Sequence, residues 1–189
     1  MNIALIVTDA GPLITLAVAD ALDTLKLLQA RIVIPDMVHF EVTRYAHKPG
    51  AQTVIAWLQA NRQVVEIATT EEFAEFSELL SINPAARTRN RGEHAAAEVL
   101  ANALEEGIDV GLLLFEDSDI RKANFLVRLP DNVLILSTST FLHGLQRRNL
   151  IQDADAILNR ATTVRGATAL AEAAFATKGA EAALNAWTN

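Results

Sequence analysis

The stretch VTDAGPLITLA, residues 7–17, ends a run of strand-forming residues on an aspartate and turns at once into a helical pattern. The run that precedes it, residues 3–8, is apolar or β-branched, which predicts a β-strand. Pro12 suits the first turn of a helix, because the N–H that proline lacks would have no helical partner there. We therefore expect a strand followed directly by a helix, with Asp9 at the carboxyl end of the strand.

The same alternation of apolar runs and helical patterns continues along the chain. Strands are expected at residues 3–8, 31–35, 63–68, 111–115 and 133–136. Helices are expected from Pro12 to about Leu25 and at residues 36–45, 51–60, 70–80, 93–105, 118–127 and 138–147, with Thr69 and Glu72 as a capping box. Short apolar strands that alternate with helices favour a parallel sheet buried on both faces, which is a three-layer α/β/α domain.

The length of 189 residues suits one domain with a sizeable core. The strand signal stops near residue 150, so residues 1–152 are expected to form the sheet domain. Residues 153–189 are expected to form a helical extension packed on the same domain, with helices at 153–161, 167–177 and 180–187. These helices are interpreted as a cover for the core or as an interface for a homo-oligomer, and a functional lid is the alternative.

Composition excludes several classes of function. The formal net charge of −7 means that any polyanion must be held by local basic patches or by bound cations. The chain has no cysteine, which excludes disulfides and thiolate metal sites. It contains no apolar run long enough to span a membrane, and its start reads as a strand rather than as a signal peptide. We expect a cytoplasmic protein with no membrane partner.

Acidic residues follow two of the expected strands, at the edge where open α/β sheets bind their ligands. Asp9 ends the first strand, and Glu116 with Asp117 ends the apolar run of the fourth, with Asp119 two residues further on. An aspartate in such a position can equally be a helix cap. The recurrence of the pattern at two strand ends favours a functional site.

Two further acids lie in expected helices. Glu93 opens the helix EHAAAEVLANALEE, whose alanines allow close packing near the sheet, and Glu41 lies in the helix that follows the second strand. An acid in the first turn of a helix is also favoured by the helix dipole, and Glu41 could be a solvated acid or a partner of Arg44. Neither residue alone predicts a site.

Four segments in this order resemble the PIN-domain ribonucleases, and especially the VapC-type toxins of prokaryotic toxin-antitoxin pairs. They are TDAGPLITLA around Asp9, VHFEVTR around Glu41, GEHAAAEVLA around Glu93 and LLFEDSDIRKA around Asp117, followed by LSTSTFLHGLQRRNLI. The resemblance covers residues 3 to about 152. The order of the segments is more specific than any single acid.

The resemblance implies that these acids converge at one end of the sheet to hold Mg²⁺ or Mn²⁺. Asp9, Glu41, Glu93 and Asp117 are the catalytic residues it implies, and Asp119 is a further metal ligand beside Asp9, Glu93 and Asp117. It leaves open which of Glu116, Asp117 and Asp119 contacts the ion. Close carboxylates repel one another unless a cation neutralises them, and hard oxygen ligands suit these two ions.

The activity that the resemblance implies is metal-dependent hydrolysis of RNA to products with a 5′-phosphate and a 3′-hydroxyl. Thr138 falls where the family places a hydroxyl residue beside the site. The basic residues Arg87, Arg89, Arg91 and Arg121 are expected to contact RNA phosphates.

A toxin role would add a small antitoxin protein as a partner. The alternative function is a catalytically inactive PIN-like scaffold that acts through protein contacts. A phosphatase of the haloacid dehalogenase type also has an aspartate after its first strand, but it needs a second aspartate where this chain has Gly11.

Overall fold

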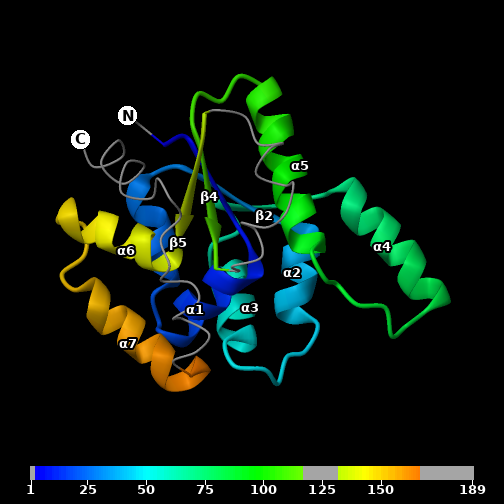
Figure 1. Cartoon of the computed structure of the whole chain (residues 1–189), viewed down its shortest axis with the longest axis horizontal. Helices are drawn as coiled ribbons and strands as arrows, with labels where there is room; N and C mark the ends of the chain where they lie inside the picture. Colours follow the sequence, from blue (N-terminus) through cyan, green and yellow to red (C-terminus); the bar gives the residue numbers. More distant parts are fainter. Residues whose placement is uncertain (1–2, 117–131, 167–189) are drawn as a thin grey trace.

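Parallel strands form the central sheet of the computed structural model, which describes residues 3–116 and 132–166 (Figure 1). Within those residues the sheet has five strands in the order β3-β2-β1-β4-β5. The strands are β1 (Leu5–Thr8), β2 (Arg31–Pro35), β3 (Val65–Ala68), β4 (Gly111–Phe115) and β5 (Val133–Ser137), and every pairing is parallel. The expected strands are thereby confirmed.

The switch point of the sheet lies at β1, because β2 pairs with one of its edges and β4 with the other. Thr8, the last residue of β1, is in register with Leu114 near the end of β4. The residues that follow these two strands therefore emerge side by side at the carboxyl edge of the sheet, where open α/β folds bind ligands.

Helices connect the strands and cover both faces of the sheet (Figure 1). They are α1 (Ala10–Val18), α2 (Asp36–Thr43), α3 (Ala51–Ala60), α4 (Glu71–Ile82), α5 (Arg91–Glu105), α6 (Thr138–Arg147) and α7 (Ala154–Arg165), with a 3-10 helix η1 (Leu22–Leu28) after α1. Among the helices of the described residues, none is long and apolar enough to cross a membrane.

Alternate residues of each strand point to different layers, which is why both faces of the strands are apolar. Ile6 and Leu112 belong to a core cluster that also contains side chains of α1, α6 and α7. Leu5 and Leu113 belong to a second cluster with Ala96, Val99 and Leu100 of α5. The three-layer α/β/α architecture expected from the sequence is confirmed.

Two local expectations about the helices are wrong. The helix expected to continue to Leu25 ends at Val18, where the backbone N–H of Ala21 donates to the carbonyl of Leu16 and Asp20 takes a positive φ of 52°. This is the Schellman type of helix termination. The N-cap of α4 is Thr70 rather than Thr69, and its hydroxyl accepts from the N–H of Phe73.

The expected C-terminal extension is described only as far as Gly166. Its first helix, α7, packs against α1 and α6 (Figure 1). The helices expected at residues 118–127, 167–177 and 180–187 lie outside the described residues.

Candidate active site

Asp9 lies at the junction of β1 and α1. Its backbone N–H donates to the carbonyl of Leu114 at 3.0 Å, so the pairing with β4 extends to the acid itself. It occupies the N-cap position of α1, yet its side chain makes no capping hydrogen bond. The carboxylate is buried, with 9% of the residue exposed. Helix capping therefore does not account for this aspartate.

Gly92 brings the start of α5 against two of the predicted acids. A Cβ atom built on Gly92 would lie 2.8 Å from Oδ1 of Asp9 and 2.9 Å from Oε2 of Glu41. Only a residue without a side chain leaves both carboxylates where they are. The loop after β1, helix α2 and helix α5 thus place Asp9 and Glu41 around Gly92, with Glu93 as the next residue.

Burial and the charge of neighbouring carboxylates raise the pKa of Asp9 and of Glu41. Burial raises the pKa of Asp9 from 3.8 to about 7, with the negative charge of Glu93 as the next largest cause and smaller contributions from Glu41 and Glu116. A hydrogen bond from the N–H of Ala10 opposes this rise.

The pKa of Glu41 is raised from 4.5 to about 7, mainly by burial. A hydrogen bond with the Thr88 side chain lowers it, and the charge of Glu93 raises it. The carboxylates of Asp9 and Glu41 therefore both lie in the electric field of a third acid, Glu93.

Glu116 is the buried acid at the end of β4. Its Oε1 accepts from the hydroxyl of Thr138 at 2.6 Å, and its Oε2 accepts from the hydroxyl of Thr15 at 2.9 Å. The guanidinium of Arg165 forms an ion pair with the same Oε2. Gly11 makes room for it, since a Cβ atom there would lie 3.0 Å from the Cβ of Glu116.

The structure thus brings together Asp9, Glu41 and Glu93, with Glu116 and Thr138 adjacent. Of the three acids left open after β4, the structure describes Glu116, while Asp117, Asp119 and Arg121 lie outside the described residues. The sequence marks Glu116 in the same way as Asp9, by its position directly after a strand. Glu116 is the first polar residue after the apolar strand β4.

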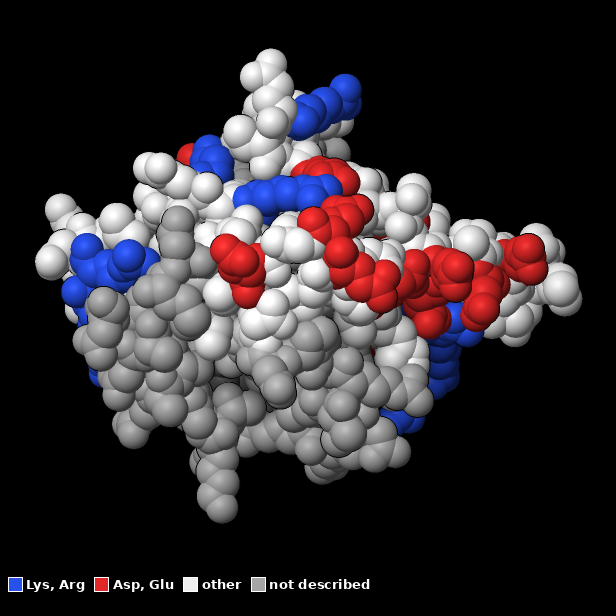
Figure 2. Space-filling view, turned by 90° about the horizontal axis from the view of Figure 1, so that it is seen from above, with Lys and Arg blue, Asp and Glu red and all other residues white. Residues whose placement is uncertain are grey.

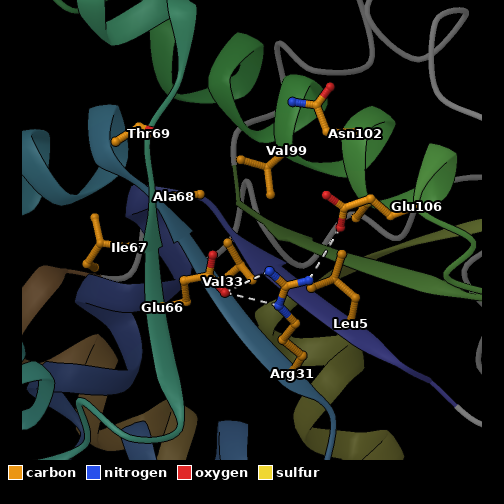
Figure 3. A pocket seen from close by; sticks show the side chains of 11 residues that line it. Leu5, Arg31, Val33, Glu66, Ile67, Ala68, Thr69, Val99, Asn102 and Glu106 are labelled. Carbon is orange, nitrogen blue, oxygen red and sulfur yellow. Dashed lines mark hydrogen bonds and ion pairs between the residues drawn. The ribbon is translucent and has the colours of Figure 1, made fainter.

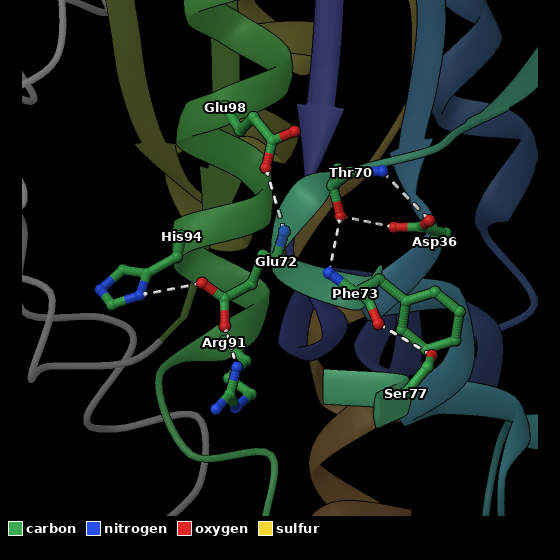
Figure 4. Close-up of polar contacts among 8 residues, drawn as sticks. All are labelled: Asp36, Thr70, Glu72, Phe73, Ser77, Arg91, His94 and Glu98. Carbon is green, nitrogen blue, oxygen red and sulfur yellow. Dashed lines mark hydrogen bonds and ion pairs between the residues drawn. The ribbon is translucent and has the colours of Figure 1, made fainter. Parts of the chain in front are cut away.

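The predicted phosphate-binding arginines differ in their surroundings. Arg87 and Arg89 are exposed in the segment between α4 and α5. Arg91 instead pairs with Glu72 and lies over the ring of Phe76, 5.1 Å from its centroid. Figure 4 shows Arg91 pointing to Glu72, which holds the start of α5 against α4. Arg91 is engaged within the fold, so the two exposed arginines are the better candidates.

A cavity on the α5 face of the sheet offers a different kind of site. It has a volume of about 240 Å³ and lies beside β2, β3 and the second half of α5. Figure 3 shows Arg31 inside it, with its guanidinium 2.8 Å from Oε2 of Glu66 and 3.8 Å from Oε2 of Glu106. Because its arginine is already paired with two acids, this cavity does not resemble an anion site.

The family model DUF3368, described as a PIN domain, matches residues 5–163. The chain belongs to the PIN-domain family. PIN domains are generally nucleases that use divalent metal ions, so membership assigns a nuclease-type function in general terms. A comparison with curated proteins and one with solved structures each gave no significant match.

The acids of this PIN domain fit a divalent cation by their chemistry. Among residues 3–116 and 132–166, no three acids or histidines are already gathered as a ligand set. Yet Asp9 and Glu41 present hard carboxylate oxygens within 3 Å of one position at Gly92, and both have a pKa raised to about 7. A bound divalent ion would remove the repulsion that causes part of these shifts.

Proposed function

We propose that this PIN domain is a metal-dependent endoribonuclease that hydrolyses RNA phosphodiester bonds at the crevice of Asp9, Glu41 and Glu93. The observation that carries the proposal is the pair of carboxylates of Asp9 and Glu41 beside Gly92. Burying two acids beside a third destabilises a fold unless a bound cation offsets their negative charge. A cluster of raised pKa values is also typical of functional sites.

Asp9, Glu41 and Glu93 would hold Mg²⁺ or Mn²⁺ through carboxylate oxygens, and Asp117 and Asp119 are the further ligands that the resemblance implies. Bound there, the ion would lower the pKa of a coordinated water and offset the charge of the phosphodiester. The protein's own part is to hold the acids at fixed positions, with the pKa of Asp9 and of Glu41 raised to about 7, so that these two carboxyls lose their protons near neutral pH. The register of β1 with β4 and the close approach at Gly92 support that role.

Glu116 and Thr138 are proposed to position the crevice rather than to react. Thr138 is fully buried and donates to Oε1 of Glu116 at 2.6 Å. This contact ties the N-terminus of α6 to the end of β4, beside the strand end that bears Asp9. A shift of α6 would therefore also shift Glu116, next to the proposed metal site.

RNA is proposed to approach from the carboxyl edge of the sheet. Figure 2 views the molecule from the opposite end, where the strands begin, and shows acidic side chains gathered toward the tip formed by α4. The exposed glutamates of α4, among them Glu71, Glu75 and Glu78, would repel phosphates from that side. Arg87 and Arg89 lie in the segment that leads to Glu93, which favours phosphate contacts next to the crevice.

The test is cleavage of labelled RNA by the purified full chain in Mn²⁺, in Mg²⁺ and in EDTA. The proposal expects cleavage with either ion, none in EDTA, and products that carry a 5′-phosphate. Folded protein that leaves RNA intact with both ions would refute the nuclease and favour the inactive scaffold.

A toxin role is the finer proposal, supported by the resemblance to VapC-type proteins. Induced expression of the wild-type chain in bacteria should arrest growth, and an Asp9→Asn chain at equal abundance should not. Equal growth of both strains would refute the toxin role while leaving RNA cleavage to be judged by the assay above.

A further inference from the structure

Arg165, at the end of α7, reaches into the candidate active site. Its Nη1 forms an ion pair with Oε2 of Glu116, donates to the hydroxyl oxygen of Thr15 and donates to the carbonyl of Gly11 at 3.2 Å. Two oxygens of α1 and one of the residue that follows β4 thus surround one cationic nitrogen. Hard oxygens gathered around a positive charge are also what a divalent ion requires.

The position of α7 is set by features independent of this ion pair. Ala154, Ile157 and Ala161 are buried against the rest of the core, and the side chain of Asp153 caps the helix by accepting from the N–H of Ala156. Arg165 is in the last turn, where the helix dipole favours a cation. The packing of α7 therefore places the guanidinium of Arg165 beside Glu116 without depending on their ion pair.

Arg165 leaves Glu116 with little capacity for another ligand. Oε1 already accepts from Thr138, and Oε2 accepts from both Thr15 and Arg165. The side chain of Glu116 is 6% exposed and that of Arg165 is 20% exposed, so the pair is only weakly screened by solvent. Glu116 is thus paired with a cation inside the protein.

We propose that Arg165 is an internal counter-cation that competes with a divalent ion for Glu116, an inference that rests on the nuclease function proposed above. With Arg165 seated, Glu116 is a positioning residue, and an ion is held by the acids around Gly92. When the positive charge is removed, Glu116 becomes an additional ligand. Arg165 therefore limits the affinity of the crevice for metal.

The test is binding of Mn²⁺ to the full chain, followed by the electron paramagnetic resonance signal of free Mn²⁺ at fixed pH and ionic strength. Arg165→Gln should bind Mn²⁺ more tightly than the wild type, on the order of tenfold, because a unit positive charge beside the site is lost. Arg165→Lys keeps the charge and should bind as the wild type does. Arg160→Gln is the matched control on the same helix, since Arg160 donates to the carbonyl of Ala19 outside the site.

A double variant tests whether the effect acts through Glu116. If Arg165 competes for that carboxylate, Arg165→Gln should have no effect on Mn²⁺ affinity in a chain that already carries Glu116→Gln. The double variant contains no unpaired buried charge, so it also serves if Arg165→Gln alone fails to fold. An equal tightening in both backgrounds would show a long-range charge effect and overturn the proposal.

The outcomes separate this inference from the proposed function. Wild-type binding that is lost in Asp9→Asn, together with unchanged or weaker binding in Arg165→Gln, would leave the nuclease site in place and refute the competition. Tighter binding in Arg165→Gln supports both. Absence of Mn²⁺ binding in the wild type and in Arg165→Gln alike would refute the metal site and the competition together.

Discussion

Asp9 and Glu41 come from different elements, yet an oxygen of each lies within 3 Å of the position that a Cβ atom on Gly92 would occupy. One carboxylate follows β1 and the other lies on α2, and the first turn of α5 lies against both. Their proximity depends on a residue that has no side chain. The geometry of the proposed metal site is consequently sensitive to one methyl group.

Gly92→Ala tests this dependence. Helix propensity alone would make alanine more stable than glycine in α5 by about 1 kcal/mol. The added methyl group must instead displace the ends of two carboxylate side chains, so we expect Mn²⁺ affinity to fall by about tenfold or more while the chain stays folded. Asn102→Ala, an exposed substitution on the same helix, is the control. Unchanged Mn²⁺ affinity in Gly92→Ala would contradict the proposed placement of the ion.

The raised pKa of Asp9 predicts a pH-dependent stability. The unfolded chain loses the proton of this acid near pH 3.8, whereas the folded, metal-free chain keeps it to about pH 7. The folded state therefore binds more protons between these values, and the stability contributed by protonated Asp9 is lost as pH rises through about 7.

Asp9→Asn removes this titration. In EDTA, its free energy of unfolding should rise relative to the wild type by on the order of 1–3 kcal/mol between pH 4 and pH 8. Urea unfolding across this range measures the difference, with Asp20→Asn as the exposed control. Parallel stability profiles for the wild type and Asp9→Asn would show that Asp9 is not a destabilised buried acid.

The hydroxyl of Thr138 is expected to stabilise the carboxyl edge of the sheet. Thr138→Val removes the donor to Oε1 of Glu116 and leaves that buried oxygen without this hydrogen bond, at a cost of about 1–3 kcal/mol. Thr138→Ser keeps the donor, so its loss of stability should be smaller. Equal urea midpoints for Thr138→Val and the wild type would mean that the hydrogen bond contributes nothing.

Arg87 and Arg89 should contribute to RNA affinity through phosphates. Replacing both with glutamine in an Asp9→Asn chain, which is not expected to cleave, should weaken RNA binding. It should also reduce the salt dependence by about 0.7 per lost contact in a plot of log affinity against log salt. Arg62→Gln is the control, because this exposed arginine precedes β3 at the other edge of the sheet. The same salt slope for all three chains would exclude these arginines from the interface.

The strand pattern of the sequence predicts the carboxyl edge well, because it depends on local properties. Glu116 follows an unbroken apolar run and Asp9 follows a run of apolar and β-branched residues that ends on Thr8, and the register of Thr8 with Leu114 confirms that these runs end side by side. A strand that is buried on both faces is apolar along its length, so its first polar residue marks the point where the strand ends.

The sequence pattern does not predict side-chain contacts between segments that are distant in the chain. Asp36 on α2 accepts hydrogen bonds from both the N–H and the hydroxyl of Thr70, which helps to explain why the helix is capped one residue later than the sequence pattern predicts (Figure 4). Arg165 and Glu116 are 49 residues apart, and no periodicity or motif reports that they meet. The packing of α7 against α1 decides that contact.

The rate of RNA cleavage by Asp9→Asn, compared with that by Asp20→Asn at saturating Mn²⁺, tests the central claim most directly. Both variants make the same chemical change, but Asp9 is buried at the crevice and Asp20 is exposed beyond the far end of α1. We predict wild-type cleavage by Asp20→Asn and a loss of at least about a hundredfold in Asp9→Asn, because a ligand to the catalytic ion is removed. Equal, EDTA-resistant cleavage by both variants would show that the acids around Gly92 are not the active site.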